Sequence, residues 1–128
     1  MISLFTSTQY PAELERYVSV DAVKSRDLRG VSVLLHAATG EAQLDRLAWL
    51  AFALVLGLPR SGHTCVDLEN IAQWAPEDLK NDSDEWPIAG KAWKDAVLAC
   101  QKLVCTPETL NEHPRKPFVI SGNKLYSA

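Results

Sequence analysis

The chain has 128 residues, the size of one domain with a single core, and 47% of them are hydrophobic. That hydrophobic share excludes an intrinsically disordered chain. Because 13 Lys and Arg stand against 16 Asp and Glu, the net charge of −3 argues against a protein that grips nucleic acid mainly through bulk positive charge. We therefore expect one globular domain over residues 1–128.

The compartment follows from features that the sequence lacks. No segment approaches the roughly 20 apolar residues that a membrane-spanning helix needs. Residues 1–10 do not show the basic and then apolar pattern of a secretory signal. The three cysteines, Cys65, Cys100 and Cys105, are an odd number, which favours free thiols in a reducing compartment. We expect a cytoplasmic protein without membrane contact.

Helical patterns occupy the first half of the chain. Pro11 is suited to the first turn of a helix, and apolar residues then recur at helical spacing. Residues 28–30 are predicted to break this helix, and the apolar run at 31–38 fits either a helix or a strand. Residues 39–41 are a plausible start for the next helix.

The most apolar segment covers residues 47–58 and ends at the Pro and Gly residues of 59–62. Twelve residues are too few to cross a membrane. A helix that is apolar on nearly every side must have neighbours packed all round it. This segment is therefore predicted to be the central helix of the core.

The second half mixes strands and helices. Residues 63–66 are β-prone, and Asp67 can cap a short helix that follows them. From Pro87 to Val104 apolar residues recur at steps of three and four, which predicts one long helix. Residues 117–126 are typical of a β-hairpin whose turn contains Gly122.

These elements predict a mainly α fold with a small antiparallel sheet built on the C-terminal hairpin. Because a lone hairpin is only marginally stable in water, we expect it to recruit residues 63–66 as a third strand. The order of helices, a strand, a helix and a terminal hairpin is that of a winged-helix-like α+β domain.

Acidic side chains concentrate in residues 61–99, which contain eight acidic and three basic residues, with most of the acids between 77 and 85. This turn-rich stretch is most simply a solvated loop, and the alternative is a docking patch for a basic partner. Trp74 and Trp86 flank it. Exposed aromatic rings there would suit a protein interface, and the alternative is that both rings cap the core.

No residue pattern indicates catalysis or cofactor binding. Residues 57–64 match the phosphate-binding pattern G-x-x-x-x-G-K-[ST] except that His63 replaces the lysine, and the segment is predicted to follow a helix instead of a strand. The histidines and cysteines do not show the paired spacing of a zinc site, and buried thiols explain the cysteines better. Nothing indicates a nucleophile beside a base. We predict no catalytic, cofactor-binding or metal-binding residue.

Direct DNA binding has one local argument. Arg115, Lys116 and Lys124 lie on the predicted terminal hairpin, where a wing would contact backbone phosphates. Three cations make a weak footprint, and lysines on an exposed hairpin also prevent edge-to-edge aggregation. A winged-helix DNA-binding module is therefore the alternative function.

Several segments in this order resemble a known family. They are residues 28–38, the apolar helix, the G-H-T-C-V-D-L segment at 62–68 and the P-F-V-I-S-G-N-K-L-Y segment at 117–126. The chain resembles the N-terminal domain of the alpha subunit of exodeoxyribonuclease V (RecD), part of the RecBCD helicase–nuclease. The residues that carry this signature, all with structural roles in the resemblance, are Gly62, His63, Cys65, Leu68, Gly122, Leu125 and Tyr126.

The resemblance implies a non-catalytic assembly domain that docks against the RecC-like gamma subunit of a heterotrimeric complex. That complex acts in double-strand-break repair and recombination, and this domain would meet DNA only through the full assembly. The family's ATP-dependent 5′→3′ helicase activity belongs to motor domains expected after these residues. ATP and Mg²⁺ are therefore expected only there. The chain departs from the family after Tyr126, where Ser127 and Ala128 replace the usual continuation of the strand.

Overall fold

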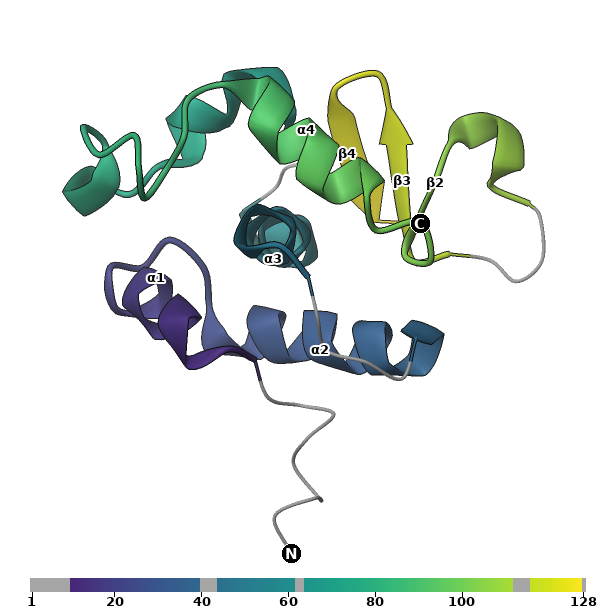
Figure 1. Cartoon of the computed structure of the whole chain (residues 1–128), viewed down its shortest axis with the longest axis horizontal. Helices are drawn as coiled ribbons and strands as arrows, with labels where there is room; N and C mark the ends of the chain where they lie inside the picture. The colour runs from purple at the N-terminus through teal and green to yellow at the C-terminus, as the bar shows by residue number, and fades with distance from the viewer. Residues whose placement is uncertain (1–9, 40–43, 62–63, 112–115, 128) are drawn as a thin grey trace, which may run out of the picture.

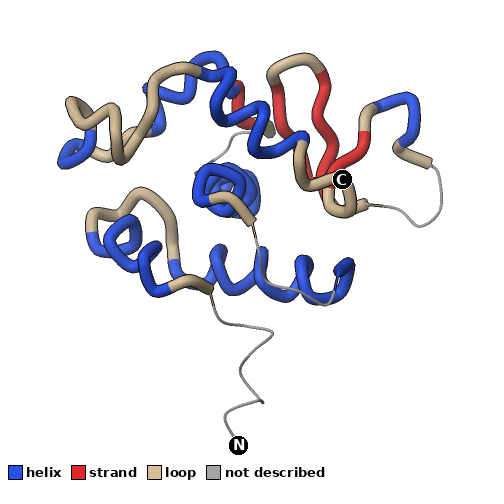
Figure 2. Tube along the Cα trace, viewed as in Figure 1, coloured by secondary structure: helices blue, strands red, loops and turns tan. Residues whose placement is uncertain are grey.

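The structure is a computed structural model that describes residues 10–39, 44–61, 64–111 and 116–127. Helices dominate it, and a small four-stranded sheet lies at one side (Figures 1 and 2). The mainly α, α+β class is therefore confirmed. In chain order the elements are η2 (Ala12–Leu14), α1 (Glu15–Ser19), α2 (Ser25–Thr39), α3 (Arg46–Ser61), β1 (Val66–Asp67), η3 (Leu68–Trp74), η4 (Glu77–Leu79), α4 (Gly90–Leu98), β2 (Val104–Cys105), η5 (Pro107–Thr109), β3 (Phe118–Ser121) and β4 (Lys124–Ser127).

Helix α3 is the centre of the molecule, as its apolar sequence predicts. In Figure 1 it is seen end-on, with α2 below it and α4 and the hairpin above it. Residues 47–55 are each at most 8% exposed. Asp45 caps the helix, because its carboxylate accepts the Leu47 N–H at 2.8 Å and its carbonyl accepts the Trp49 N–H at 3.1 Å. No helix among the described residues is long and apolar enough to cross a membrane.

Helix α2 overturns two boundary predictions. It runs unbroken from Ser25 to Thr39, through the break expected at residues 28–30. Leu28, Val31 and Leu35 are buried at helical spacing, and their burial outweighs the cost of about 1 kcal/mol for a glycine inside a helix. A Cβ on Gly30 would lie 3.0 Å from a methyl carbon of Leu56 in α3, so this glycine lets the two helices approach.

The prediction that a helix begins at residues 39–41 is also wrong at Thr39, the one residue of the three that the structure describes. Thr39 ends α2, and α3 begins only at Arg46. Residues 40 and 41 lie outside the described part of the chain.

The first helix is shorter than its sequence suggests. It stops at Ser19, where the Ala22 N–H donates to the Tyr17 carbonyl at 2.8 Å and the Asp21 N–H donates to the Val18 carbonyl at 3.0 Å. These two bonds form a Schellman motif, which satisfies the last carbonyls of a helix. Asp21 takes the left-handed position, with φ of 63°, that such a motif requires. The chain can therefore turn sharply from α1 into α2.

Three strands of the sheet match the expectation from the sequence. The sheet has the order β1-β4-β3-β2, and β3 and β4 form an antiparallel hairpin. Gly122 has φ of 62° in the two-residue turn between them. Strand β1 pairs antiparallel with β4, with Val66 opposite Leu125. The predicted recruitment of a third strand is confirmed, but the strand is shorter and lies later than residues 63–66: Thr64 and Cys65 are outside it, and residue 63 lies outside the described residues.

The fourth strand corrects the prediction of a purely antiparallel sheet and of a helix that reaches Val104. Helix α4 ends at Leu98, and β2 pairs parallel with β3. The Phe118 N–H donates to the Leu103 carbonyl at 3.0 Å, which joins the two strands at their start. Val104 and Cys105 are both buried. Their β-branched and apolar side chains gain more from the sheet than from continuing an amphipathic helix.

The start of α4 lies in backbone contact with η3. A Cβ on Gly90 would lie 2.4 Å from the Leu68 carbonyl oxygen and 2.9 Å from the Glu69 Cα. Both neighbours are backbone atoms, which cannot move aside as the tip of a side chain can. Only glycine lets α4 start here, and this contact sets how the segment between η3 and α4 is folded back.

Gly90→Ala is expected to lower the free energy of unfolding by about 1–3 kcal/mol, because the added methyl overlaps fixed backbone. Urea unfolding followed by circular dichroism measures the change. Gly122→Asn is the matched control, since Asn tolerates positive φ and the structure leaves open space there. A Gly90→Ala variant as stable as the parent would contradict the close contact.

Candidate protein interface

The acidic segment, residues 77–85, is compact. It begins with η4, and the Asp82 N–H donates to the Leu79 carbonyl while the Trp86 N–H donates to the Asp82 carbonyl at 2.9 Å. The Asp82 carboxylate also accepts the N–H groups of Asp84 and Glu85, both at 3.2 Å. Four of its acids are exposed, as expected for a solvated surface: Glu77, Asp78, Asp82 and Asp84.

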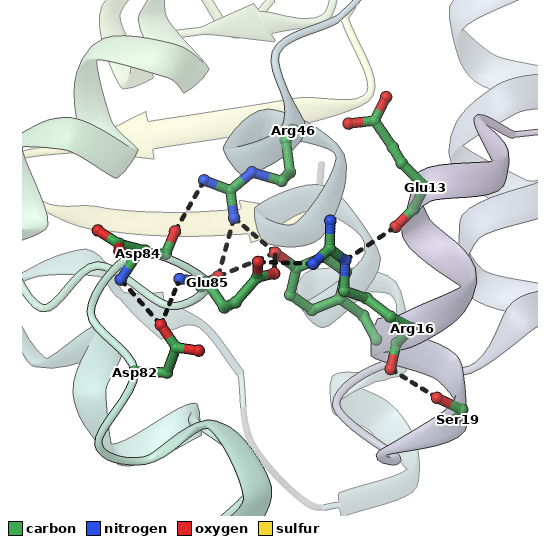
Figure 3. A network of polar contacts seen from close by, with 8 residues as sticks. Glu13, Arg16, Ser19, Arg46, Asp82, Asp84 and Glu85 are labelled. Atoms are coloured by element: carbon green, nitrogen blue, oxygen red, sulfur yellow. Dashed lines mark hydrogen bonds and ion pairs between the residues drawn. The ribbon is translucent and has the colours of Figure 1, made fainter.

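Glu85 does not follow that expectation, because it is half-buried at the centre of a polar network (Figure 3). Its carboxylate pairs with the Arg16 guanidinium at 2.6 Å and lies 3.0 Å from the Tyr17 hydroxyl. Arg46 donates to the Tyr17 hydroxyl and to the Glu85 carbonyl at 2.9 Å. It also donates to the Asp84 carbonyl at 3.2 Å.

This Arg46–Tyr17–Glu85 network joins three parts of the chain. Arg16 and Tyr17 come from α1, Arg46 is the first residue of α3, and Glu85 ends the acidic segment. Arg46 satisfies two backbone carbonyls, and the network leaves the other four acids pointing to solvent. Burial raises the pKa of Tyr17, an effect that Arg46 opposes, so the hydroxyl stays protonated and can donate. The acidic segment is therefore held against the core.

Sequence reasoning missed this network, because its partners are up to 69 residues apart. No local spacing links Arg46 to Glu85. The only available signal was the unequal charge of the halves, with balanced charge before residue 60 and an excess of acid in 61–99.

The two tryptophans that flank the segment do not form an exposed aromatic surface. Trp86 is only 1% exposed, and its indole N–H donates to the Ile71 carbonyl at 3.0 Å. It packs against Trp93, with ring centroids 4.9 Å apart. Trp74 is half-buried. The expectation of an interface built on Trp86 is therefore wrong, since its ring and its N–H both find partners in the core.

Ile88, two residues after Trp86, is a large apolar side chain in solvent, with 64% of its surface exposed. Its backbone is held on one side, because the Trp93 indole N–H donates to the Pro87 carbonyl at 2.8 Å. An aliphatic side chain on a fixed backbone can insert into a partner at little entropic cost. We define Glu77, Asp78, Asp82, Asp84 and Ile88 as the acidic surface.

Five residues of the family signature lie in the described part of the chain. Leu68 and Leu125 are fully buried, whereas Cys65 and Tyr126 are half-buried. Gly122 occupies the hairpin turn. Gly62 and His63 lie outside the described residues.

The two basic residues of the hairpin that the structure describes lie at its opposite ends. Lys124 is exposed beside the turn, whereas Lys116 is half-buried before the start of β3, at the other end of the hairpin. Arg115 lies outside the described residues.

The described residues do not fit a nucleotide or a metal. Helix α3 continues to Ser61, so residues 57–61 follow no strand and open no helix. In the part of the chain that the structure describes, no three His, Cys, Asp or Glu side chains lie close enough to hold a metal ion. Burial raises the pKa of the Cys100 thiol to about 11, with a further contribution from the charge of Asp45, which keeps the thiol protonated at neutral pH.

Comparison with known proteins gives one match. A family model described as the RecBCD enzyme subunit RecD, N-terminal domain, matches residues 24–126. The match covers most of the chain, from just before α2 to β4. No curated protein and no solved structure matches it.

Arg46→Met is expected to lower the free energy of unfolding by about 1–3 kcal/mol, because it leaves two carbonyls and the Tyr17 hydroxyl without their donor. Tyr17→Phe is expected to cost about 1 kcal/mol, and the double variant less than the sum of the two. Lys91→Gln is the control, since its ion pair with Asp95 is exposed on both sides, shares no partner with the network and should contribute little to stability. Strictly additive effects in urea unfolding would contradict a shared network.

The stability is expected to fall with pH in the alkaline range. Because the folded pKa of Cys100 is about 11 and its ordinary value is 9.0, the stabilising contribution is present below pH 9 and is lost between pH 9 and 11. Urea unfolding at pH 8, 9, 10 and 11 measures this decline. Cys100→Ala should flatten it, and Cys65→Ala, which removes a different thiol, should leave it in place. An identical decline in Cys100→Ala would contradict the assignment.

Proposed function

The chain belongs to the family of N-terminal domains of the RecBCD subunit RecD, and we propose that it is a non-catalytic assembly domain of that helicase–nuclease subunit. In this proposal it docks on the RecC-like gamma subunit of the complex. It acts in the cytoplasm, in double-strand-break repair and recombination. It holds no cofactor, because ATP and Mg²⁺ serve the motor domains of the subunit.

The acidic surface carries the proposal. Among the described residues its four exposed carboxylates form no group that could hold a metal ion. Arg16 and Arg46 hold the acidic segment in place through the Arg46–Tyr17–Glu85 network. Ile88, which follows these acids in the chain, adds an exposed aliphatic side chain. An apolar side chain bordered by charge is typical of a protein interface, and the charge favours a partner surface with Lys and Arg around an apolar pocket.

A winged-helix DNA-binding module remains the alternative, and the exposed Lys124 beside the hairpin turn favours it. The two functions differ in an observable way. Contacts with phosphates predict retention on duplex DNA that weakens steeply with salt. Docking through carboxylates predicts binding to a basic protein surface and no retention on DNA.

The 128-residue chain is expected to bind the purified gamma subunit, and Ile88→Ser combined with Asp78→Lys and Asp84→Lys should weaken the binding at least tenfold. The side chains of these three residues make no contact in the network, so the domain should stay folded. Biolayer interferometry measures the affinity, and circular dichroism checks the fold.

Glu13→Lys with Glu108→Lys is the control, because it makes the same change in net charge at two exposed residues on η2 and η5, outside the acidic surface. It should bind as the parent does. No binding by the parent would refute the assembly role, and equal losses in both variants would refute the acidic surface as its site. Salt-sensitive retention on duplex DNA that Lys124→Glu abolishes would favour the alternative.

A further inference from the structure

Helix α2 has one face that the described structure leaves uncovered. Arg26, Arg29, Val33 and Ala37 are all exposed, and they recur at steps of three, four and four. This spacing places them in one stripe along the helix, opposite the buried side that carries Leu28, Val31 and Leu35. In Figure 1, α2 forms the lowest layer of the molecule and packs on α3 with its upper side. We call these four residues the α2 stripe.

The composition of the α2 stripe is unusual for a solvated face. A solvated helix face generally carries charges of both signs, whereas here two arginines at one end are followed by Val33, which is 46% exposed, and by Ala37. Neither Arg26 nor Arg29 forms an ion pair with any residue that the structure describes. The acidic residue Asp21 lies nearby, but Lys24 pairs with it at 2.7 Å. Among the residues that the structure describes, no carboxylate therefore pairs with either guanidinium group.

The basic end of the stripe borders a hollow in the surface. An open hollow of about 480 Å³ lies where α1 turns into α2. Its lining consists of Arg26 and Arg29, the ion pair of Lys24 with Asp21, Ser25, and the aliphatic residues Val18 and Val23. A carboxylate side chain that enters it meets guanidinium groups that can bind it in a bidentate way, while its methylene groups contact the valines.

We propose that the α2 stripe docks an acidic, aliphatic segment of another protein subunit of the complex. Aspartate or glutamate side chains of that segment pair with Arg26 and Arg29 at the hollow, and its aliphatic side chains cover Val33 and Ala37. This inference rests on the proposed assembly function. It adds a second interface, because the acidic surface lies in the layer above α3 and α2 lies below it (Figure 1).

Two features favour a protein partner over DNA. The centre of the stripe is aliphatic, and Val33 and Ala37 offer no donor to a phosphate. Both cations are arginines, which are enriched in protein interfaces and bind carboxylates with fixed geometry. A phosphate-binding face of the same length would need cations along its whole length, since the charges of DNA repeat along the strand.

Arg26→Glu with Arg29→Glu is expected to weaken binding of the 128-residue chain to the other two subunits, beta and gamma, at least tenfold. Val33→Asp alone should weaken it severalfold. All three side chains are exposed, so circular dichroism and urea unfolding should match the parent. Lys102→Glu with Lys124→Glu is the matched control, because it gives the same change in net charge at exposed residues outside the stripe. The probes are the purified gamma subunit and the beta–gamma pair, each immobilised for biolayer interferometry.

Each outcome separates this inference from the proposed function. Loss of binding in the stripe variants, with binding kept in the control, supports the α2 stripe. Unchanged affinity of the stripe variants overturns it and leaves the assembly function intact, whereas no binding by the parent overturns both. Two other occupants would also overturn it. One is duplex DNA, if the stripe variants lose only salt-sensitive retention on DNA. The other is a second copy of this chain, if light scattering shows a dimer that the variants abolish.

Discussion

The apolar character of α3 is the constraint on which the rest of the structure depends. Its residues are buried on every side, so at least one element must cover each side of the helix. Helix α2 covers one side, and α4, β1 and β4 cover others. Fully burying each large side chain of α3 contributes about 1.5–3 kcal/mol. The sheet is too small to be stable alone, and it is stabilised by packing on α3. Phe118 of β3 stacks on Phe52 of α3, with ring centroids 4.3 Å apart.

The polar network follows from the same constraint. The first turn of a helix is where backbone N–H groups lack partners within the helix. Arg46 is the first residue of α3, so its side chain lies where the helix leaves the apolar core. From there its guanidinium reaches the Tyr17 hydroxyl and the carbonyls of Asp84 and Glu85. Without these hydrogen bonds, nothing would favour packing of the negatively charged acidic segment against an apolar core. The network holds Glu85, the last residue of the acidic segment, against the core, and it leaves the earlier acids of the segment in solvent.

Sequence patterns predicted the elements whose cause is local. The apolar run at 47–58, the turn at Gly122 and the cap at Asp67 each depend on residues close together in the chain, and each is present in the structure. Patterns failed where a distant contact decides. Gly30 reads as a breaker until the approach of Leu56 is known, and Val104 continues a helical period until Phe118 offers a parallel strand. Glu85 was predicted to lie in a solvated loop, and Trp86 was predicted either to be exposed at an interface or to cap the core, because their partners lie in other elements.

The elements that cover α3 also determine what the domain presents to other molecules. An element that buries one face against a central helix must turn its other face to solvent. Core packing therefore does not restrict which side chains the outer face carries. On the two sides of α3 these outer faces differ in sign. Arg26 and Arg29 lie on α2, below α3, whereas the segment from η4 to the start of α4, which contains the acidic surface, lies above α3 (Figure 1). The net charge of −3 does not reveal this, because the excess of acid in residues 61–99 is partly offset by an excess of basic residues in 100–128. With the two proposed interfaces, the domain would meet a basic surface on one side and an acidic segment on the other.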